Sequence, residues 1–320
     1  MTASFLLSHA LPDDVRLQSP DAAVRRLALI DAAESEDDAC VPLLIHALRH
    51  DIDAGVRRTA AEALGAWELP DAVDALCDGL HDRDTSVRTA AADSLAGLKQ
   101  TDLGLILLAR LDDPDTEVRT ALLRALRELR LPQSAAPARQ QLTHTSAAVR
   151  REAIGVLGWL RHVPALPGLA ALAQRDPEPE VRRAAVGALA FAADDSVLPT
   201  LVDALLDTDW QVREEAAATL GKLRLTDACL ALEAALDDTY WQVALQAARA
   251  LGRLGQPQSA HAVATLLTYP ISNVRKEAAL ALGEIGTPAD LIVLEASLQD
   301  DDPEVRKAAR IAIAQIGQRG

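Results

Sequence analysis

Apolar and polar positions repeat along the whole chain at intervals of 31 or 32 residues. The clearest copy is Val274-Arg275-Lys276-Glu277-Ala278-Ala279-Leu280-Ala281-Leu282-Gly283. Equivalent segments begin at evenly spaced valines: Val24, Val56, Val87, Val118, Val149, Val181, Val212, Val243 and Val305, of which all but Val243 are followed by arginine. A fixed period of this length is typical of a stacked array of supersecondary units.

Each unit is predicted to contain two helices joined by a tight turn. In residues 194–223, apolar residues follow a helical period up to the turn at residues 207–209, and a second helix runs from about Trp210 to Lys222. Glycines near the ends of second helices, such as Gly221, Gly252 and Gly283, fit helix C-termini. We therefore expect an all-α solenoid of about ten two-helix repeats that extends as one array over residues 1–320.

The two ends of the array are expected to differ from its middle. Residues 1–36 form a degenerate repeat, in which the apolar segment Phe5-Leu6-Leu7 is interrupted at Pro12-Asp13-Asp14 and the usual Ala-Leu-Gly ending is missing. This segment is predicted to be an N-terminal capping repeat, because a terminal unit must present one polar face to water. Residues 287–320 are predicted to be the C-terminal repeat.

Composition narrows the class of partner. The net charge is −15 and aromatic residues make up only 2 % of the chain, so nucleic acid is not the favoured partner. The three cysteines have no metal-ligand or disulfide spacing and are expected to be buried thiols. No signal peptide and no apolar run long enough to span a membrane is found. The sequence therefore predicts a cytoplasmic protein with no membrane contact and no cofactor.

Acidic residues recur at two positions of each turn. Three residues before the repeat valine stand residues expected to cap the following helix: Asp21, Asp53, Asp84, Asp115, Ser146, Asp209 and Asp302. Two residues earlier stand acids at the end of the first helix, where the helix dipole disfavours an anion: Asp51, Asp82, Asp113, Asp176, Asp207, Asp238 and Asp300. An acid in that place needs a cation, and the arginine after each valine supplies one.

We expect these groups to form a structural ladder of Arg–Asp pairs, within or between repeats. Its representative members are Arg57, Arg88, Arg119, Asp82, Asp113 and Asp207. The acids occur in nearly every repeat, whereas an active site or a metal site occurs once. They are therefore predicted to be structural.

The pattern Asp-x-Asp-x-x-Val-Arg-x-x-Ala-x-x-Ala-Leu-Gly resembles the HEAT-like repeats of the phycobilisome lyase family, over essentially the whole chain. The resemblance implies a right-handed α-solenoid of HEAT-like repeats with the second helices lining the concave side. That family includes bilin lyase subunits, adaptor scaffolds and a di-iron hydroxylase. The hydroxylase branch carries His-Glu dipeptides where this chain has Arg151-Glu152, Glu214-Glu215 and Lys276-Glu277. Without histidines there, the sequence predicts neither a metal site nor catalytic residues.

One column of basic residues lies two positions after the repeat valine. It contains Arg26, Arg58, Arg151, Arg183, Lys276 and Lys307. HEAT-like DNA glycosylases use a basic concave face, and this column makes a basic stripe possible here. Glutamates such as Glu214 and Glu277 interrupt it, and duplex binding requires a stronger positive field.

The repeat pattern breaks most clearly at residues 240–245, Tyr-Trp-Gln-Val-Ala-Leu, where the cap acid and the arginine are both lost. Asp237 and Asp238 are therefore expected to lack their usual partner.

Trp210 and Trp241 hold equivalent positions in adjacent repeats, which predicts a separation of roughly 10 Å, one helix spacing. The candidate partner-binding residues are Trp159, Trp210, Arg213, Tyr240, Trp241, Leu245, Arg249 and Tyr269. The alternative is that these aromatic residues only cover the ends of the repeat core.

These features predict a non-enzymatic scaffold that binds another protein through the concave face of the solenoid. The alternative is an accessory, lyase-like or chaperone-like subunit that handles a cofactor or a chromophore such as a bilin. Nucleic-acid binding is the third and weakest interpretation.

Overall fold

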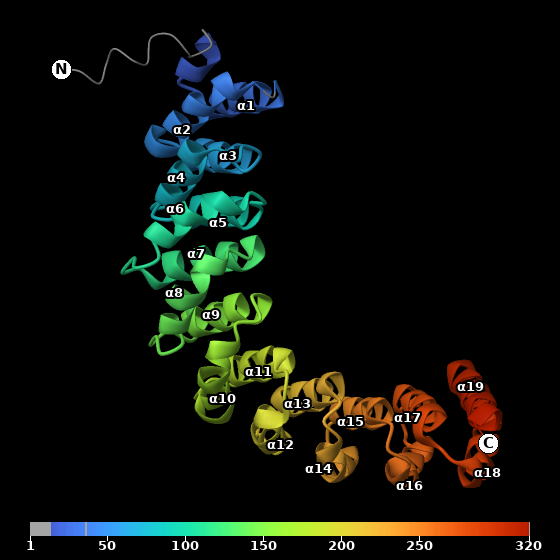
Figure 1. Cartoon of the computed structure of the whole chain (residues 1–320). Helices are drawn as coiled ribbons and strands as arrows, with labels where there is room; N and C mark the ends of the chain where they lie inside the picture. The colour runs from blue at the N-terminus through green and yellow to red at the C-terminus, as the bar shows by residue number, and fades with distance from the viewer. Residues whose placement is uncertain (1–13, 36, 320) are drawn as a thin grey trace. The chain divides into compact units, whose positions relative to one another are not determined.

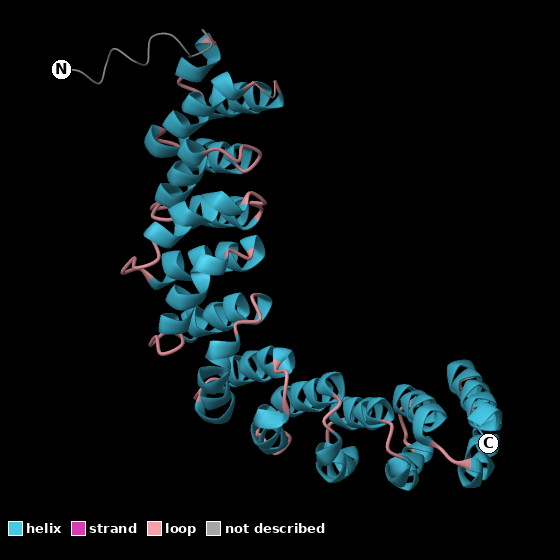
Figure 2. Ribbon diagram, viewed as in Figure 1, coloured by secondary structure: helices cyan, strands magenta, loops and turns pink. Residues whose placement is uncertain are grey.

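The computed structural model describes residues 14–35 and 37–319. This part of the chain forms nineteen α-helices and no strand, joined by short 3-10 turns and loops (Figure 2). The prediction of an all-α solenoid is confirmed. None of the described helices is long and apolar enough to cross a membrane.

The chain divides into two compact units, residues 1–160 and 161–320. In both units the first and second helices of successive repeats form two separate layers (Figure 1). In residues 1–160 the second helices are α1 (Ala22–Glu34), α3 (Ala54–Leu64), α5 (Thr85–Ala96), α7 (Thr116–Leu129) and α9 (Ala147–Trp159). The first helices of this unit are α2 (Val41–His50), α4 (Pro70–Gly79), α6 (Gly104–Ala109) and α8 (Ala135–Gln141).

Residues 161–320 repeat the same two-layer plan. The second helices are α11 (Pro179–Ala188), α13 (Trp210–Leu223), α15 (Trp241–Leu254), α17 (Ser272–Ile285) and α19 (Pro303–Arg319). The first helices are α10 (Leu166–Arg175), α12 (Leu198–Ala204), α14 (Cys229–Ala234), α16 (Ala260–Ala264) and α18 (Leu291–Ala296). The segment expected at residues 210–222 is thus a helix with nearly the predicted bounds.

The repeat valine anchors every second helix to its own repeat. The nine valines of this column from Val56 to Val305 are 0–3 % exposed, and Val24 of the first repeat is half-buried. Full burial of a valine contributes on the order of 1.5 kcal/mol or more to the free energy of folding. Alanines and leucines fill the space around it, because helices rich in alanine can approach closely.

The expected terminal repeats correspond to α1 at the N-terminal end and to α18 with α19 at the C-terminal end. The segments Phe5-Leu6-Leu7 and Pro12-Asp13 lie outside the described residues.

Three glycines predicted to end helices have a different role. Gly221, Gly252 and Gly283 lie inside α13, α15 and α17, which continue for two residues or more beyond them. A Cβ atom at Gly252 would lie 3.0 Å from the Cα of Ala281 in α17, and the other two glycines face Ala250 and Ala312 at 2.9 and 3.1 Å. The helix-terminus prediction was wrong: each glycine allows close contact with the next second helix.

We expect Gly252→Ala to lower the free energy of unfolding of the protein by about 1–3 kcal/mol, because the added methyl group meets backbone atoms that have no room to move. Urea unfolding followed by circular dichroism measures the change. Gly317→Ala is the matched control, since a Cβ atom at Gly317 in α19 meets no atom within 4 Å. The control is expected to be neutral or stabilising by up to about 1 kcal/mol. Equal destabilisation by both variants would show that the contact with Ala281 does not matter.

Candidate partner-binding surface

The turns between first and second helices are joined by arginines that reach into the next repeat. Arg57, in α3, donates from Nε and Nη2 to both carboxylate oxygens of Asp82, at 2.6 and 2.8 Å. Its Nη1 donates to the backbone oxygen of Asp51 in its own turn, at 2.9 Å. The Asp82 carboxylate also accepts the backbone N–H of Asp84 at 2.8 Å. One arginine therefore connects two consecutive turns.

Further pairs among the described residues show the same two-oxygen geometry. All of these pairs have donor–acceptor distances of 2.6 to 2.9 Å and join consecutive repeats: Arg25–Asp51, Arg182–Asp207, Arg213–Asp238 and Arg275–Asp300. Because both partners are largely buried in each pair, water screens the attraction between their charges only weakly.

Three members of the predicted ladder make different contacts. Arg88 donates to the backbone oxygen of Asp82 and to Thr85, and Asp113 is in contact with His81, at 3.0 Å. Arg119 binds the backbone oxygen of Asp113 and the side-chain oxygen of Gln141. The expected Arg–Asp pairs are not formed there. Arg119 has no acid to bind in the next turn, because His144 stands where the other repeats have an aspartate.

The prediction that Asp238 lacks a partner was wrong, because each bridging arginine binds the carboxylate of the next repeat and not that of its own repeat. Asp238 is held by Arg213 of the preceding repeat at 2.6 and 2.9 Å. Ala244 stands where the next arginine would be, and the acid that this arginine would bind is replaced by Tyr269. Both halves of one bridge are thus missing together.

The bridges lower the pKa values of the turn carboxyls. Burial raises the pKa of Asp207, but hydrogen bonds from Arg182 and from the backbone of Asp209 outweigh it, so the pKa lies below its ordinary value. The pKa of Asp238 is lowered against burial in the same way, by Arg213 and by the Tyr240 amide. These carboxyls are therefore ionised in the folded protein near neutral pH.

The geometry predicts that Arg182→Ala destabilises the protein more than Arg119→Ala does. Removing Arg182 leaves the Asp207 carboxylate largely buried without its cation, which costs about 2–3 kcal/mol. Arg119 faces only a backbone oxygen and an amide, so its removal is expected to cost about 1 kcal/mol. Thermal and urea unfolding of both variants measure the difference. The reverse order would contradict a dominant contribution from the bridges.

Acid is expected to weaken the bridges. Because the folded pKa of Asp207 is lowered, its contribution to stability is complete above the ordinary carboxyl pKa of about 3.9 and is lost as the pH falls from there through the lower folded value. The difference in free energy of unfolding between wild type and Asp207→Asn should therefore be constant from pH 7 to 5 and shrink below about pH 4. Urea unfolding at a series of pH values measures it. A difference that does not change with pH would contradict the assignment.

Two of the candidate aromatic residues form a stacked pair at the turns between first and second helices in residues 161–320. The rings of Trp210 and Tyr240 lie 5.4 Å apart between centres with an interplanar angle of 8°. The guanidinium carbon of Arg213 lies 5.7 Å from the centre of the Tyr240 ring. Tyr240 is 46 % exposed. The sequence expected Trp210 beside Trp241, whereas its stacking partner is Tyr240, the residue before Trp241.

The remaining candidates lie elsewhere. Arg249 was expected to supply charge to the aromatic residues, but its guanidinium binds both oxygens of Glu277 in α17 at 2.8 Å. Leu245 and Tyr269 are half-buried. Trp159 belongs to residues 1–160 and is covered by Arg130, whose guanidinium carbon lies 4.4 Å from the ring centre.

Most basic residues of the column on the second helices contact a nearby acidic or polar side chain. Arg58 pairs with Glu62 at 3.4 Å, Arg183 with Glu215 at 3.9 Å and Lys307 with Glu304 at 3.9 Å. The other members also lie on second helices: Arg26, which donates to Thr59, Arg151, which lies 3.5 Å from Glu152, and Lys276. This arrangement does not form a continuous positive surface.

An apolar groove that was not predicted lies between α12 and α14, with a volume of about 490 Å³. Its apolar lining comes from both helices and the turns after them: Val202, Leu205, Leu206, Ala231, Ala234 and Ala235. Arg213, Asp207 and Asp238 line its turn end, so the groove reaches the residues that support the aromatic pair. Leu206 is 81 % exposed at its border. None of these lining residues is unusual for its position in the repeat, so the groove could not be found from the sequence.

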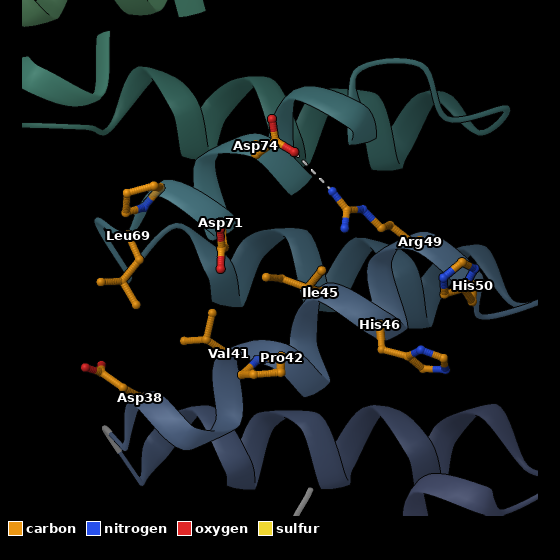
Figure 3. A pocket seen from close by; sticks show the side chains of 11 residues that line it. Asp38, Val41, Pro42, Ile45, His46, Arg49, His50, Leu69, Asp71 and Asp74 are labelled. Atoms are coloured by element: carbon orange, nitrogen blue, oxygen red, sulfur yellow. Dashed lines mark hydrogen bonds and ion pairs between the residues drawn. The ribbon is translucent and has the colours of Figure 1, made fainter. Parts of the chain in front are cut away.

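A second groove lies between α2 and α4 in residues 1–160, with a volume of about 760 Å³ (Figure 3). Val41, Ile45 and Leu69 supply apolar lining. At one end of the groove the rings of His46 and His50 lie 4.9 Å apart between centres and are tilted by 53°. Arg49, beside them, is held at 2.6 Å by Asp78 and at 3.3 Å by Asp74. The lining therefore combines apolar surface with both signs of charge.

Reactive and metal-binding groups are sparse among the described residues. Cys40, Cys77 and Cys229 are buried free thiols, as expected from the sequence, and burial raises the pKa of Cys77 to about 12. No group of three or more His, Cys, Asp or Glu side chains arranged to hold a metal ion is found in this part of the chain.

Comparison with protein families decides the classification. The family model for HEAT repeats matches residues 15–96, 105–189, 166–242 and 230–314. The chain belongs to the HEAT-repeat family. The phycobilisome lyase subfamily is the finer expectation and is not what this match shows. No curated protein matches the chain in a sequence search.

Solved structures show the same fold at low identity. An engineered protein is 24 % identical over 94 % of this chain and 97 % of its own, with a TM-score of 0.57. The Escherichia coli protein YibA is 20 % identical over 84 % of this chain and 99 % of its own, with a TM-score of 0.62. Kap95p, solved in a complex with RanGDP, is 15 % identical over 96 % of this chain and 50 % of its own, with a TM-score of 0.64. At these identities the similarity shows a shared fold and nothing about function.

Proposed function

We propose that this HEAT-repeat protein is a non-enzymatic scaffold that binds another protein. The observation that carries the proposal is the stacked pair of Trp210 and Tyr240, in which Tyr240 is 46 % exposed and contacts Arg213, a residue that lines the apolar groove between α12 and α14. A large aromatic surface held rigid by stacking, next to a groove that admits an apolar side chain, has the composition of a protein-interface hot spot.

The surface formed by the turns between first and second helices fits this role better than the surface formed by the second helices. On that face, Arg249 is bound to Glu277 and Arg127 to Glu152, at 2.8 and 3.0 Å. A partner that used those charges would have to break existing bridges. Binding at Tyr240 requires no such loss, because this residue is 46 % exposed. A structural neighbour, Kap95p, supports protein binding in general terms, since it was solved with Ran and in a complex with Nup1.

A second candidate function is the accessory handling of a cofactor or chromophore such as a bilin. The groove between α2 and α4 favours it, because a volume of about 760 Å³ with apolar walls and a few polar groups lies in the range of small-molecule sites. An absorption spectrum of protein purified from its natural source separates the two functions. Visible absorbance that is lost in an Ile45→Arg variant would support ligand handling at this groove.

We expect Trp210→Ala/Tyr240→Ala to weaken binding of a protein partner by at least about tenfold, because each truncation removes a rigid aromatic contact. An affinity pull-down from the natural host with the tagged full chain measures the loss, after circular dichroism has shown that the variant keeps its helix content. Ile52→Ala/Leu105→Ala is the matched control, because both residues are large, apolar and exposed, at 81 % and 51 %, and lie in residues 1–160 outside the candidate set. Equal capture by wild type and by the double variant would contradict a role of the aromatic pair.

A further inference from the structure

The arginine that follows the last repeat valine, Arg306 in α19, is anchored in the same way as the bridging arginines. Its Nη1 donates to the backbone oxygens of Asp300 and Asp301 in its own turn, at 2.6 and 3.0 Å. In Arg275, one repeat earlier, Nη1 likewise donates to two backbone oxygens of its own turn. Arg275 then uses Nε and Nη2 for the two oxygens of Asp300. The anchoring therefore orients both guanidinium groups alike.

Arg306 differs from the bridging arginines because it has no carboxylate to bind. The helix that carries it, α19, is the last one in the described part of the chain (Figure 1). Within residues 14–35 and 37–319, no group accepts a hydrogen bond from its Nε or Nη2. Arg306 thus keeps two oriented donors in the geometry that binds an aspartate at Arg213 and Arg275.

The turn acids before α19 interact with the preceding repeat. Residues 300–319 contain four acids and four bases, so their position matters more than their number. The Asp300 carboxylate gives both oxygens to Arg275 and attracts Arg306 only through space. Hydrogen bonds from Ser272 in α17 and from the backbone of Glu304 lower the pKa of Asp302. These two carboxylates therefore face the preceding repeat.

The other two acids of this segment do not bind the donors of Arg306 either. Glu304 lies 3.9 Å from Lys307. The equivalent Glu117 in α7 contacts Arg88 of its preceding repeat at 3.5 Å, so this position also faces backwards. The negative charge of Asp301 helps to raise the pKa of an arginine of the preceding repeat, Arg275. The outer face of α19 is therefore the basic side of this repeat.

A second arginine lies on this outer face. The residue five positions after the repeat valine is buried and apolar in most inner repeats; Ala217, Ala248 and Ala279, for example, are 0 % exposed. In α19 the same position is Arg310, which is exposed and forms no ion pair with the described residues. A further HEAT repeat stacked on α19 would bury this charge without a partner. The outer face therefore suits a charged ligand better than another repeat.

The two arginines are spaced for a ligand with two carboxylates. Arg306 and Arg310 are four residues apart on one helix, which places them on the same side and about 6 Å apart along its axis. Carboxylates on alternate residues of an extended segment are about 7 Å apart and can reach both arginines. Because one exposed ion pair contributes little affinity, both contacts are needed, together with Ile311, which is 41 % exposed.

We infer that the outer face of α19 binds an acidic segment of a partner protein, in which one Asp or Glu carboxylate accepts from Nε and Nη2 of Arg306 and a second pairs with Arg310. A short acidic segment is favoured over nucleic acid, because the net charge of −15 repels a long polyanion more strongly. This surface does not include Trp210 or Tyr240. It is a second contact site, and the inference goes beyond the proposed function.

The ligand class is tested with a fluorescent peptide in which aspartates alternate with serines. Fluorescence anisotropy with the full chain is expected to show saturable binding. The same peptide with asparagine in place of aspartate should bind at least about tenfold more weakly, because it lacks the charges that the arginines attract. A single-stranded oligonucleotide of equal charge is the third probe. Equal binding of the asparagine peptide, tighter binding of the oligonucleotide, or no binding of the aspartate peptide would overturn the inference.

Variants of the two arginines test the location of the site. Arg310→Glu should weaken binding of the aspartate peptide by at least about tenfold, because it places a like charge beside the ligand. Arg306→Lys keeps the charge but loses the two-donor geometry, so about fivefold weaker binding or more is expected. Circular dichroism first checks that both variants keep their helix content. Unchanged binding by both would overturn the inference.

Arg139 is the matched control position, because it is an exposed arginine in α8 of residues 1–160. Arg139→Glu and Arg139→Lys make the same substitutions away from α19 and should leave binding of the aspartate peptide unchanged. If Arg139→Glu weakens binding as much as Arg310→Glu does, only the overall charge attracts the peptide and the inference is overturned.

The aromatic double variant separates this inference from the proposed function. Trp210→Ala/Tyr240→Ala should bind the aspartate peptide as wild type does, because neither residue lies in α19. If a partner is captured through the aromatic pair but the aspartate peptide does not bind, the inference fails and the proposed function stands. If the peptide binds through Arg306 and Arg310 while partner capture ignores the aromatic pair, the inference stands and the proposed surface fails.

Discussion

Each bridging arginine holds two consecutive turns at once, and the regular part of the array depends on this double attachment. Arg213 donates to the backbone of its own turn and to the Asp238 carboxylate of the next turn. The carboxylate, placed against the dipole at the end of a first helix, is stabilised both by the guanidinium and by a backbone N–H. One arginine side chain thus spans the distance between two consecutive turns.

This arrangement separates the surfaces that give stability from the surface proposed to give function. Second helices approach closely through Gly–Ala contacts and carry ion pairs such as Arg249–Glu277. First helices are shorter in most repeats and leave grooves between neighbours, as between α2 and α4 or between α12 and α14. Partner binding at the first helices and turns leaves the contacts of the second-helix layer intact.

Much of the fold could be predicted because it depends on local, repeated signals. The valine column, the turn acids and the helical period each recur with the same spacing, so α13 was placed almost to the residue. The glycines were misinterpreted, because glycine is found both at helix C-termini and where two helices approach closely. The partner of Asp238 was missed because the sequence gives the spacing of arginines and acids but not the direction in which the side chain extends.

The candidate site was predicted only in part for a similar reason. Trp210 and Tyr240 stood out as departures from the repeat, but their stacking depends on side-chain rotamers. The groove beside them is formed by residues of two repeats, none of which is unusual by itself. Position-by-position comparison of repeats detects an unusual residue and overlooks a shape made by ordinary ones.

The paired absence of arginine and acid at Ala244 and Tyr269 bears on how such an array can grow or be cut. At a bridged junction, insertion or deletion of repeats separates a buried cation from its anion, unless the new neighbour supplies the missing charge. The junction between α15 and the turn at Tyr269 has no such pair in its turns, and its bridge lies instead between the second helices, from Arg249 to Glu277. A module from another array joined at this junction must therefore supply one matching charge on its second helix and none in its turn.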